Sequence, residues 1–273
     1  MITTQTSGVW TLWDNYAKAN KGVLYSGDPL IFVWGFNSSG EVGQNNTTQY
    51  SSPVQVPGIQ WSSVRTSNTF SLALKNDGTM WTWGNNQIGQ LGQNNNTYYS
   101  SPVQIPGNTW KSISVGRQSS LATKTDNTLW VWGYNNQGNL GQNNTTQYSS
   151  PVQIPGTTWS SITGGNQHSL AIKTDGTLWS WGYNSNGQLG QNNNALFVSS
   201  PVQIPGTTWS SINGGSNFSL ATKTDRTLWT WGRGSFGNLG QNDIVNRSSP
   251  VQIPGTSWSS ISASFNYSAL ALG

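Results

Sequence analysis

The apolar residues of this chain are concentrated in short segments where they alternate with polar residues. In "DGTLWSWG", which starts at Asp175, Leu178 and Ser180 point to one side of an extended strand, and Trp179 and Trp181 point to the other. The segments "SSPVQIPG", "TWSSITG" and "HSLAIK" have similar lengths and are separated by turns rich in Asn, Gly and Pro. No segment keeps a helical period. The pattern predicts an all-β protein whose unit is a blade of four short antiparallel strands.

This unit is repeated along the chain. The glycines of the Trp-Gly dipeptide recur at spacings of 49, 49, 49 and 50 residues, at Gly35, Gly84, Gly133, Gly182 and Gly232. The prolines of Ser-Ser-Pro follow the same period. A period of this length is typical of a propeller blade or a solenoid unit. One copy has too few apolar residues to be stable alone, so both of its faces must pack against neighbouring copies.

The first and last copies are incomplete in complementary ways. The last copy stops at "SALALG", the fourth strand of the unit, whereas the first starts with "DPLIFVWG", so that residues 28–35 align with residues 77–84. We therefore predict that the N-terminal strand pairs beside residues 269–272 and closes the ring. The predicted fold is a five-bladed propeller of four-stranded blades over 28–273, preceded by an arm over 1–27. The alternative is an open arc that oligomerises.

The strings "LWSWGYNSNGQLGQN" and "HSLAIKTDGTLW" carry a family resemblance. They resemble the repeat of the regulator of chromosome condensation family, and the resemblance extends over all five copies. It implies a β-propeller, which in this family usually has seven blades. The founder of the family exchanges nucleotide on a small GTPase and binds chromatin, but this chain has neither an inserted wedge nor a basic tail. Its near-identical copies are similar to repeat proteins of marine bacteria and their phages. The leader "SGVWTLWDNYAKANKGVLY" also resembles a segment of phage virion proteins.

Composition narrows the classes of function. Charged residues make up only 7% of the chain and the net charge is +4, with no run of Lys or Arg. We predict no nucleic-acid binding, because a phosphate-binding surface needs clustered cations. The absence of cysteine excludes disulfides and thiolate metal sites. No apolar run reaches the roughly 18 residues of a membrane span.

The candidates for chemistry all fall on repeat positions. Five aspartates share one hairpin-turn position, where Asp is an ordinary turn residue: Asp28, Asp77, Asp126, Asp175 and Asp225. "GRGSFG" at 232–237 matches a phosphate-loop pattern, but its counterparts in the other copies are ordinary loops and no helix follows. His168 is the single histidine, and it aligns with Phe70, Ser119, Phe218 and Tyr267. We predict no catalytic site, metal or cofactor, and a protein that is not an enzyme.

Positions that differ between copies are free to specialise in binding. They fall in the loops after Trp-Gly, after "LGQN" and after the third strand of the unit, and equivalent loops of a propeller share one face. They contribute aromatic and cationic side chains in a polar surround, which suits recognition of a protein or glycan. The predicted binding residues are Phe36, Arg117, Tyr134, His168, Tyr183, Arg233, Phe236 and Phe265.

The N-terminal arm supplies aromatic residues outside the repeat, and Trp10, Trp13 and Tyr16 are the predicted anchor. We therefore hypothesise a phage virion component, such as a capsid decoration or a tail- or fibre-associated protein. Its arm would bind other virion proteins and its variable face a protein or glycan. The alternative is a cytoplasmic or secreted module that binds protein or glycan.

Overall fold

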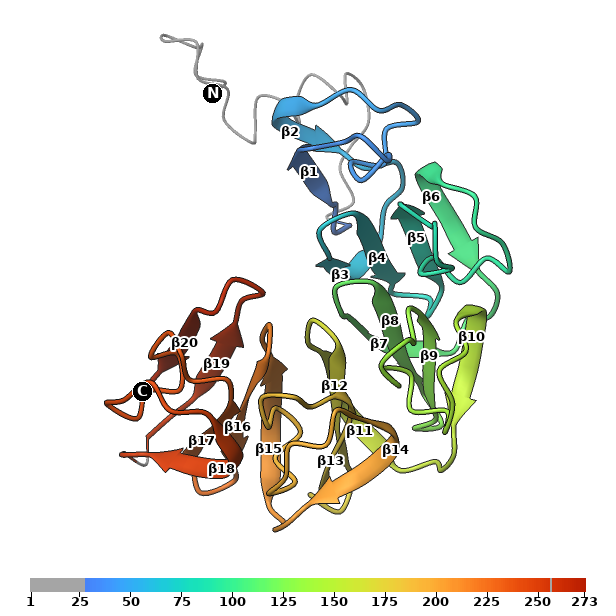
Figure 1. Ribbon diagram of the computed structural model, residues 1–273. Helices are drawn as coiled ribbons and strands as arrows, with labels where there is room; N and C mark the ends of the chain where they lie inside the picture. The colour runs from blue at the N-terminus through green and yellow to red at the C-terminus, as the bar shows by residue number, and fades with distance from the viewer. Residues whose placement is uncertain (1–27, 256) are drawn as a thin grey trace, which may run out of the picture.

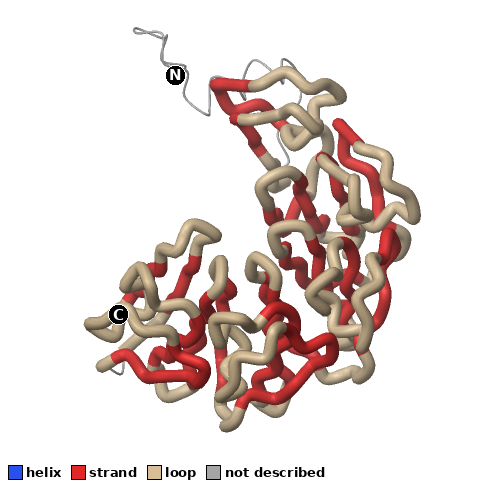
Figure 2. Tube along the Cα trace, viewed as in Figure 1, coloured by secondary structure: helices blue, strands red, loops and turns tan. Residues whose placement is uncertain are grey.

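The computed structural model describes residues 28–255 and 257–273. Throughout these residues every regular element is a strand (Figure 2). The strands form antiparallel sheets: four sheets of four strands, and a sheet of two strands at either end. The prediction of an all-β chain with repeated four-stranded units is confirmed.

Each four-stranded sheet is called a blade, and its strands follow one another in chain order. The first strand of a blade is the third strand of the sequence repeat, and the second strand of a blade is the fourth of the repeat. Blade I contains β3 (Trp61–Thr66), β4 (Phe70–Lys75), β5 (Met80–Gly84) and β6 (Tyr99–Ile105). Blade II contains β7 (Trp110–Val115), β8 (Ser119–Lys124), β9 (Leu129–Gly133) and β10 (Tyr148–Ile154). Blade III contains β11 (Trp159–Gly164), β12 (His168–Lys173), β13 (Leu178–Tyr183) and β14 (Phe197–Ile204). Blade IV contains β15 (Trp209–Gly214), β16 (Phe218–Lys223), β17 (Leu228–Gly232) and β18 (Arg247–Ile253).

The two-stranded sheets are halves of the same unit. The N-terminal half-blade, β1 (Phe32–Gly35) and β2 (Tyr50–Gln55), corresponds to the third and fourth strands of a blade. The C-terminal half-blade, β19 (Ser260–Ala263) and β20 (Ala269–Leu272), corresponds to the first and second strands.

The alternation of the third strand places two indoles on one face of each blade. In blade III the ring of Trp159, from the first strand, lies 6.2 Å from the rings of both Trp179 and Trp181. The Gly after the second indole is needed because the chain turns there with a positive φ. At Gly182, with φ +103°, a Cβ would lie 2.6 Å from the carbonyl oxygen of Gln167. The Trp-Gly dipeptide therefore combines a core residue with the end of the strand.

The apolar core lies between blades rather than within them. One cluster combines Leu72 and Met80 of blade I with Ile113 and Trp132 of blade II. Equivalent clusters join blades II and III, blades III and IV, and each half-blade to its neighbouring blade. Blades thus stabilise one another by mutual burial, as the composition of a single copy predicts.

The sheets follow one another around an arc (Figure 1). First strands of neighbouring blades contact one another and lie on the inner side, while fourth strands lie outside. The half-blades lie apart at the two ends of the arc. Among the described residues β1 pairs only with β2, and β20 only with β19.

The predicted closure of the ring by β1 pairing with β20 is therefore not what the structure has. The physical reason is that nearly identical copies pack through the same contacts at every step, and each step rotates the next blade by a similar amount. Four blades and two halves turned in this way leave their ends separated. Residues 1–27, with the predicted anchor Trp10, Trp13 and Tyr16, lie outside the described residues.

Candidate functional site

Two sets of connections lie at the same end of every blade. The turn between the first and second strands is joined to the start of the loop between the third and fourth strands by a backbone hydrogen bond. The amide of Tyr183 donates to Gln167 O at 2.8 Å, and that of Arg233 donates to Asn217 O at 2.8 Å. These turns and loops together are called the loop face. The Asp turns and the connections between blades lie at the opposite end, where the Trp159 amide donates to Asn127 O.

Most of the predicted binding residues lie on the loop face. Phe36, Arg117 and Phe236 are exposed, with Phe36 and Phe236 each about 60% accessible. Tyr134, Tyr183, Arg233 and Phe265 are half-buried. They are distributed along the arc from the N-terminal half-blade to the C-terminal one, so they do not form one compact patch.

His168 is the exception, because its side chain is buried between blades III and IV and is only 2% exposed. Its Nε2 lies 3.0 Å from the Ser219 hydroxyl, and its ring packs on Gly165, where a Cβ would lie 2.2 Å from the imidazole. Burial lowers its pKa to about 4, so the imidazole is neutral at pH 7. The prediction that His168 is a binding residue is wrong. Phe218 packs on Gly215 in the same way, and both residues are core residues.

One cluster on the loop face combines aromatic rings with a cation. The Phe236 ring lies 4.8 Å from that of Tyr267, and the Arg233 guanidinium lies 4.9 Å and 5.2 Å from the two rings. Arg233 Nη1 also donates to the Tyr267 hydroxyl at 3.4 Å. We call these three residues the Arg–aromatic cluster. It joins the third-to-fourth-strand loop of blade IV to the first turn of the C-terminal half-blade.

Tyr267 was missed because alignment by constant spacing makes it the counterpart of His168. The strand register shows otherwise: Ser211 pairs with Thr222 in blade IV, but the equivalent Ser260 pairs with Leu272. The last hairpin is therefore one residue longer, and Tyr267, with φ +64°, lies in its turn. The signal in the sequence is the pattern "SALAL", which is displaced by one residue from "SLAT" in the preceding copy.

The loop of blade IV also departs from the repeat. In the other blades a buried Asn organises this loop: Asn135 Oδ1 accepts from the Leu140 amide at 2.8 Å, and its Nδ2 donates to Thr146 O at 2.8 Å. Blade IV has Gly234 at that position, and its amide donates to Asn246 Oδ1 instead. A different loop path therefore presents Phe236, and the Arg–aromatic cluster is where the chain departs most from its own repeat.

The aspartates of the opposite end have a structural role. In blade III, Asp175 Oδ1 accepts from the Thr177 hydroxyl at 2.7 Å and from its amide at 3.0 Å, and Thr177 in turn accepts from the Trp179 indole. The hydroxyl and then the amide lower the pKa of this carboxyl, and Asp77, Asp126 and Asp225 are held in the same way. In the described part of the chain no three His, Cys, Asp or Glu side chains group as metal ligands would.

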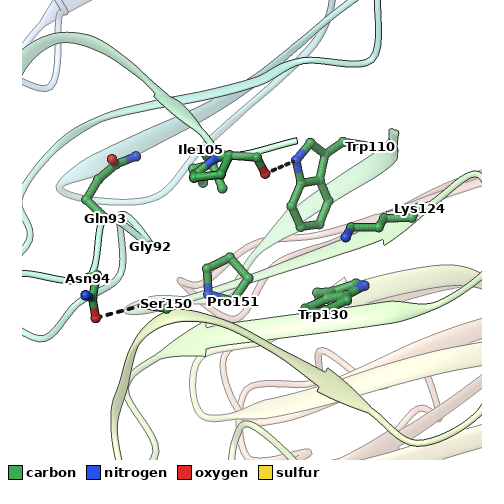
Figure 3. A pocket seen from close by; sticks show the side chains of 10 residues that line it. Gly92, Gln93, Asn94, Ile105, Trp110, Lys124, Trp130, Ser150 and Pro151 are labelled. Atoms are coloured by element: carbon green, nitrogen blue, oxygen red, sulfur yellow. Dashed lines mark hydrogen bonds between the residues drawn. The ribbon is translucent and has the colours of Figure 1, made fainter. Parts of the chain in front are cut away.

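Grooves between adjacent blades recur along the arc. Figure 3 shows the one between blades I and II, a cavity of about 280 Å³ lined by Gln93, Asn94, Trp110, Lys124 and Trp130. The Lys124 ammonium lies 4.8 Å from the Trp110 ring and 4.1 Å from that of Trp130. The counterparts of these residues line the grooves between blades II and III and between blades III and IV. Because the same lining recurs in every groove, we interpret the grooves as part of the structural repeat. The lysine ammonium over both indoles stabilises each blade.

The chain is similar to proteins of known structure. Residues 21–270 match the RCC1-like domain. Human WBSCR16 superposes with a TM-score of 0.76 and 22% identity, over 85% of this chain and 65% of the other. Prp20p from Saccharomyces cerevisiae, described with its binding properties to Gsp1p and histones, superposes with a TM-score of 0.75 and 21% identity. The match covers 86% of this chain and 62% of Prp20p. Yeast RCC1 (Prp20) bound to Kap60 has a TM-score of 0.61 and 19% identity, over 100% and 82%.

The chain spans less than two thirds of the lengths of the first two of these structures. At these identities the likeness concerns the fold. No curated protein matches the sequence. Within the residues that the structure describes, no helix is long and apolar enough to cross a membrane.

Proposed function

This chain belongs to the family of RCC1-like domains, and from that premise we propose that it is a non-catalytic module that binds a protein through its loop face. The observation that carries the proposal is the Arg–aromatic cluster. Aromatic rings and arginine are the side chains most enriched at the energetic centres of protein interfaces. Here Arg233 and Tyr267 hold Phe236 in place, yet Phe236 stays 60% exposed.

The partners of the relatives support the class of ligand. Prp20p binds Gsp1p and histones, and yeast RCC1 is bound by Kap60, so propellers of this fold serve as protein-binding surfaces. The loop face of this chain adds exposed or half-buried rings at Phe36, Tyr134 and Tyr183, surrounded by Asn, Gln, Ser and Thr. An adaptable polar surround with a few aromatic anchors suits a protein surface better than a small molecule.

The experiment is an affinity capture from the source cells, with captured proteins quantified by mass spectrometry. The bait is the wild-type chain or the triple variant Arg233→Ala, Phe236→Ala, Tyr267→Ala. A matched control replaces three exposed polar residues at the opposite end of the blades, Asn108→Ala, Thr157→Ala and Thr207→Ala. We expect a partner that the wild type and the control retain and the triple variant loses by at least tenfold. Equal capture by all three baits would rule out the cluster as the binding site.

The finer prediction is a virion component anchored by residues 1–27, and it rests on the sequence resemblance of the leader alone. It is tested by peptide mass spectrometry of purified particles and cell fractions. Peptides of this chain at a fixed ratio to a capsid or tail protein would support it, and loss of incorporation after deletion of 1–27 would identify the anchor. Recovery of the peptides in cell or secreted fractions alone would refute it. The glycan alternative is tested on the same triple variant with a glycan array.

A further inference from the structure

One tryptophan of the repeat is exposed although all its counterparts are buried. Trp83, Trp132, Trp181 and Trp231 are fully buried, but Trp34, at the same position of β1, is 60% exposed. Each buried indole is held by the loop of the preceding blade. Trp181 Nε1 donates to Asn139 O at 2.8 Å, and Trp231 Nε1 donates to Gln188 O at 2.9 Å. Only residues 28–31 of the described chain precede β1, and they are too few to form such a loop.

The other end of the arc carries the corresponding receptor. The residues that receive Trp231 are Gly190, where a Cβ would lie 3.0 Å from the indole nitrogen, and Ile204 next to it. Their counterparts in blade IV are Gly240 and Ile253, and near Gly240 only Ile253 is found. Gly240 and Ile253, together with Asn238, Trp258 and Leu270, line a cavity of about 320 Å³ between blade IV and the C-terminal half-blade. We call it the tryptophan socket.

The strand edges beside Trp34 and the socket match in register. In blade IV, β16 pairs with β17 so that Phe218 faces Gly232, Leu220 faces Thr230 and Thr222 faces Leu228. With the extra residue of the last hairpin counted, β20 and β1 occupy these two positions. Leu270 would face Val33, and Leu272 would face Ile31. Leu270 is 73% exposed and Leu272 66%, whereas Leu220 is 2% exposed. Among the described residues, β20 therefore has no neighbour at the edge where a third strand covers β16.

We propose that a second copy of this chain supplies that neighbour: β1 of one copy pairs with β20 of the next, and Trp34 enters the tryptophan socket. The contact would complete a four-stranded blade from two half-blades and continue the blade-to-blade interface that the chain already forms internally. Both edges are short and apolar, and they carry complementary halves of one sheet. The two patches differ, so the contact is head-to-tail and builds a ring if its rotation closes, or a filament if it does not.

The first test measures the mass of the full chain by light scattering at micromolar concentration. We expect the wild type to be a multiple of 29.6 kDa. Trp34→Ala, which removes the inserted side chain, should weaken association at least thirtyfold. Leu270→Lys, which places a charge in the socket, should do the same. Leu196→Ala removes an apolar side chain of equal exposure (60%) far from both ends and should leave the mass unchanged.

Complementation then tests the head-to-tail geometry. The Trp34→Ala variant keeps an intact socket, and the Leu270→Lys variant keeps an intact Trp34. Each should be monomeric alone, and an equimolar mixture should give a dimer and nothing larger. Circular dichroism of each variant shows whether it keeps the wild-type fold. A monomeric wild type, or a mixture that stays monomeric, overturns the proposal.

Cysteine pairing distinguishes a second copy from closure within one chain. The natural chain has no cysteine, so introduced pairs report one contact. Facing residues of adjacent strands lie within reach of a disulfide. A mixture of Val33→Cys and Leu270→Cys chains should give a disulfide-linked dimer on oxidation, which the additional change Trp34→Ala suppresses. If the double variant Val33→Cys, Leu270→Cys links within a monomer and the mixture does not link, the ring closes within one chain and the proposal is wrong.

Discussion

Trp181 and Trp34 occupy equivalent positions of equivalent strands, one in the interior of the arc and one at its end. The interior residue is fully buried and hydrogen-bonded to Asn139 O of the preceding blade, and the end residue is 60% exposed. The strand that carries each indole contributes little to this difference. Burial in a repeat protein is supplied by the neighbouring unit, so the same residue is core or surface according to what precedes it.

The same comparison holds for the second strand. Leu220 is buried and pairs with Thr230 in the third strand of its own blade. Its counterpart Leu270 is exposed, and no third strand pairs with β20 among the described residues. The apolar cluster between blade IV and the C-terminal half-blade is correspondingly small: the buried residues Phe218, Leu220 and Leu239 with partly buried Ile261 and Ala263. At the two ends of the arc, residues whose counterparts form the core, such as Trp34 and Leu270, are therefore exposed.

The largest difference is expected when each of the two tryptophans is replaced by alanine. Trp181→Ala removes a fully buried indole and should lower the free energy of unfolding by about 3–5 kcal/mol. Trp34→Ala in the monomer should change it by about 0.5 kcal/mol or less, as for an exposed residue. Urea denaturation at a protein concentration below that of association measures both. Equal losses would mean that Trp34 is buried in the isolated chain.

His168 sharpens the comparison between interior blades, because Phe218 fills the same position one blade further on. Burial holds the His168 pKa at about 4, below its value of 6.5 in the unfolded chain. The unfolded state therefore binds the proton first as the pH falls. The stability of the wild type should be complete above pH 6.5 and fall by about 1.4 kcal/mol per pH unit from there towards pH 4.

The matched variant is His168→Phe, which copies the residue of blade IV. It should lose this pH dependence and keep the stability seen at pH 7, because the Ser219 hydroxyl still donates to Gln188 O at 2.9 Å. Urea denaturation at pH 7 and pH 4.5 gives the comparison, because the wild type and the variant share any contribution from the turn aspartates. Parallel curves for the wild type and the variant would contradict a buried neutral imidazole.

The strands of a blade can be predicted from the sequence because the same local patterns recur in every copy. Alternation, the Trp-Gly end and the Asp turn recur in each copy, and each is a local rule. The predicted facing of Trp179 and Trp181 towards one side holds because both contact Trp159. Closure of the ring is a sum of small rotations between blades. No local pattern encodes that sum, so complementary ends alone were insufficient to predict the shape of the arc.

The candidate site was predicted in part, for a related reason. Variation between copies selects residues at the loop-face end of the blades, but it does not separate exposed residues from residues buried between blades. His168 varies because Phe, Ser and His each fit against a glycine of the first turn. Tyr267 was not predicted because one inserted residue shifts the register of the last hairpin. Aligning the copies at a constant spacing does not reveal such a shift. Strand pairing was needed to find both.

The smallest expected effect concerns the cation that each interior blade holds over two indoles. Lys75, Lys124, Lys173 and Lys223 occupy this position, and by register Gly273 takes it in the C-terminal half-blade. Lys124→Met keeps the aliphatic stem but removes the charge above Trp110 and Trp130, and it should cost about 0.5–1 kcal/mol. The control is Lys111→Met, because the exposed Lys111 ammonium donates to Asn127 Oδ1 at 3.0 Å, and this change should cost less. Thermal denaturation of the two variants side by side measures the difference. Equal shifts in melting temperature would mean that the cation over the indoles does not stabilise the interior blades. The difference between interior blades and half-blades would then come from burial of the indoles alone.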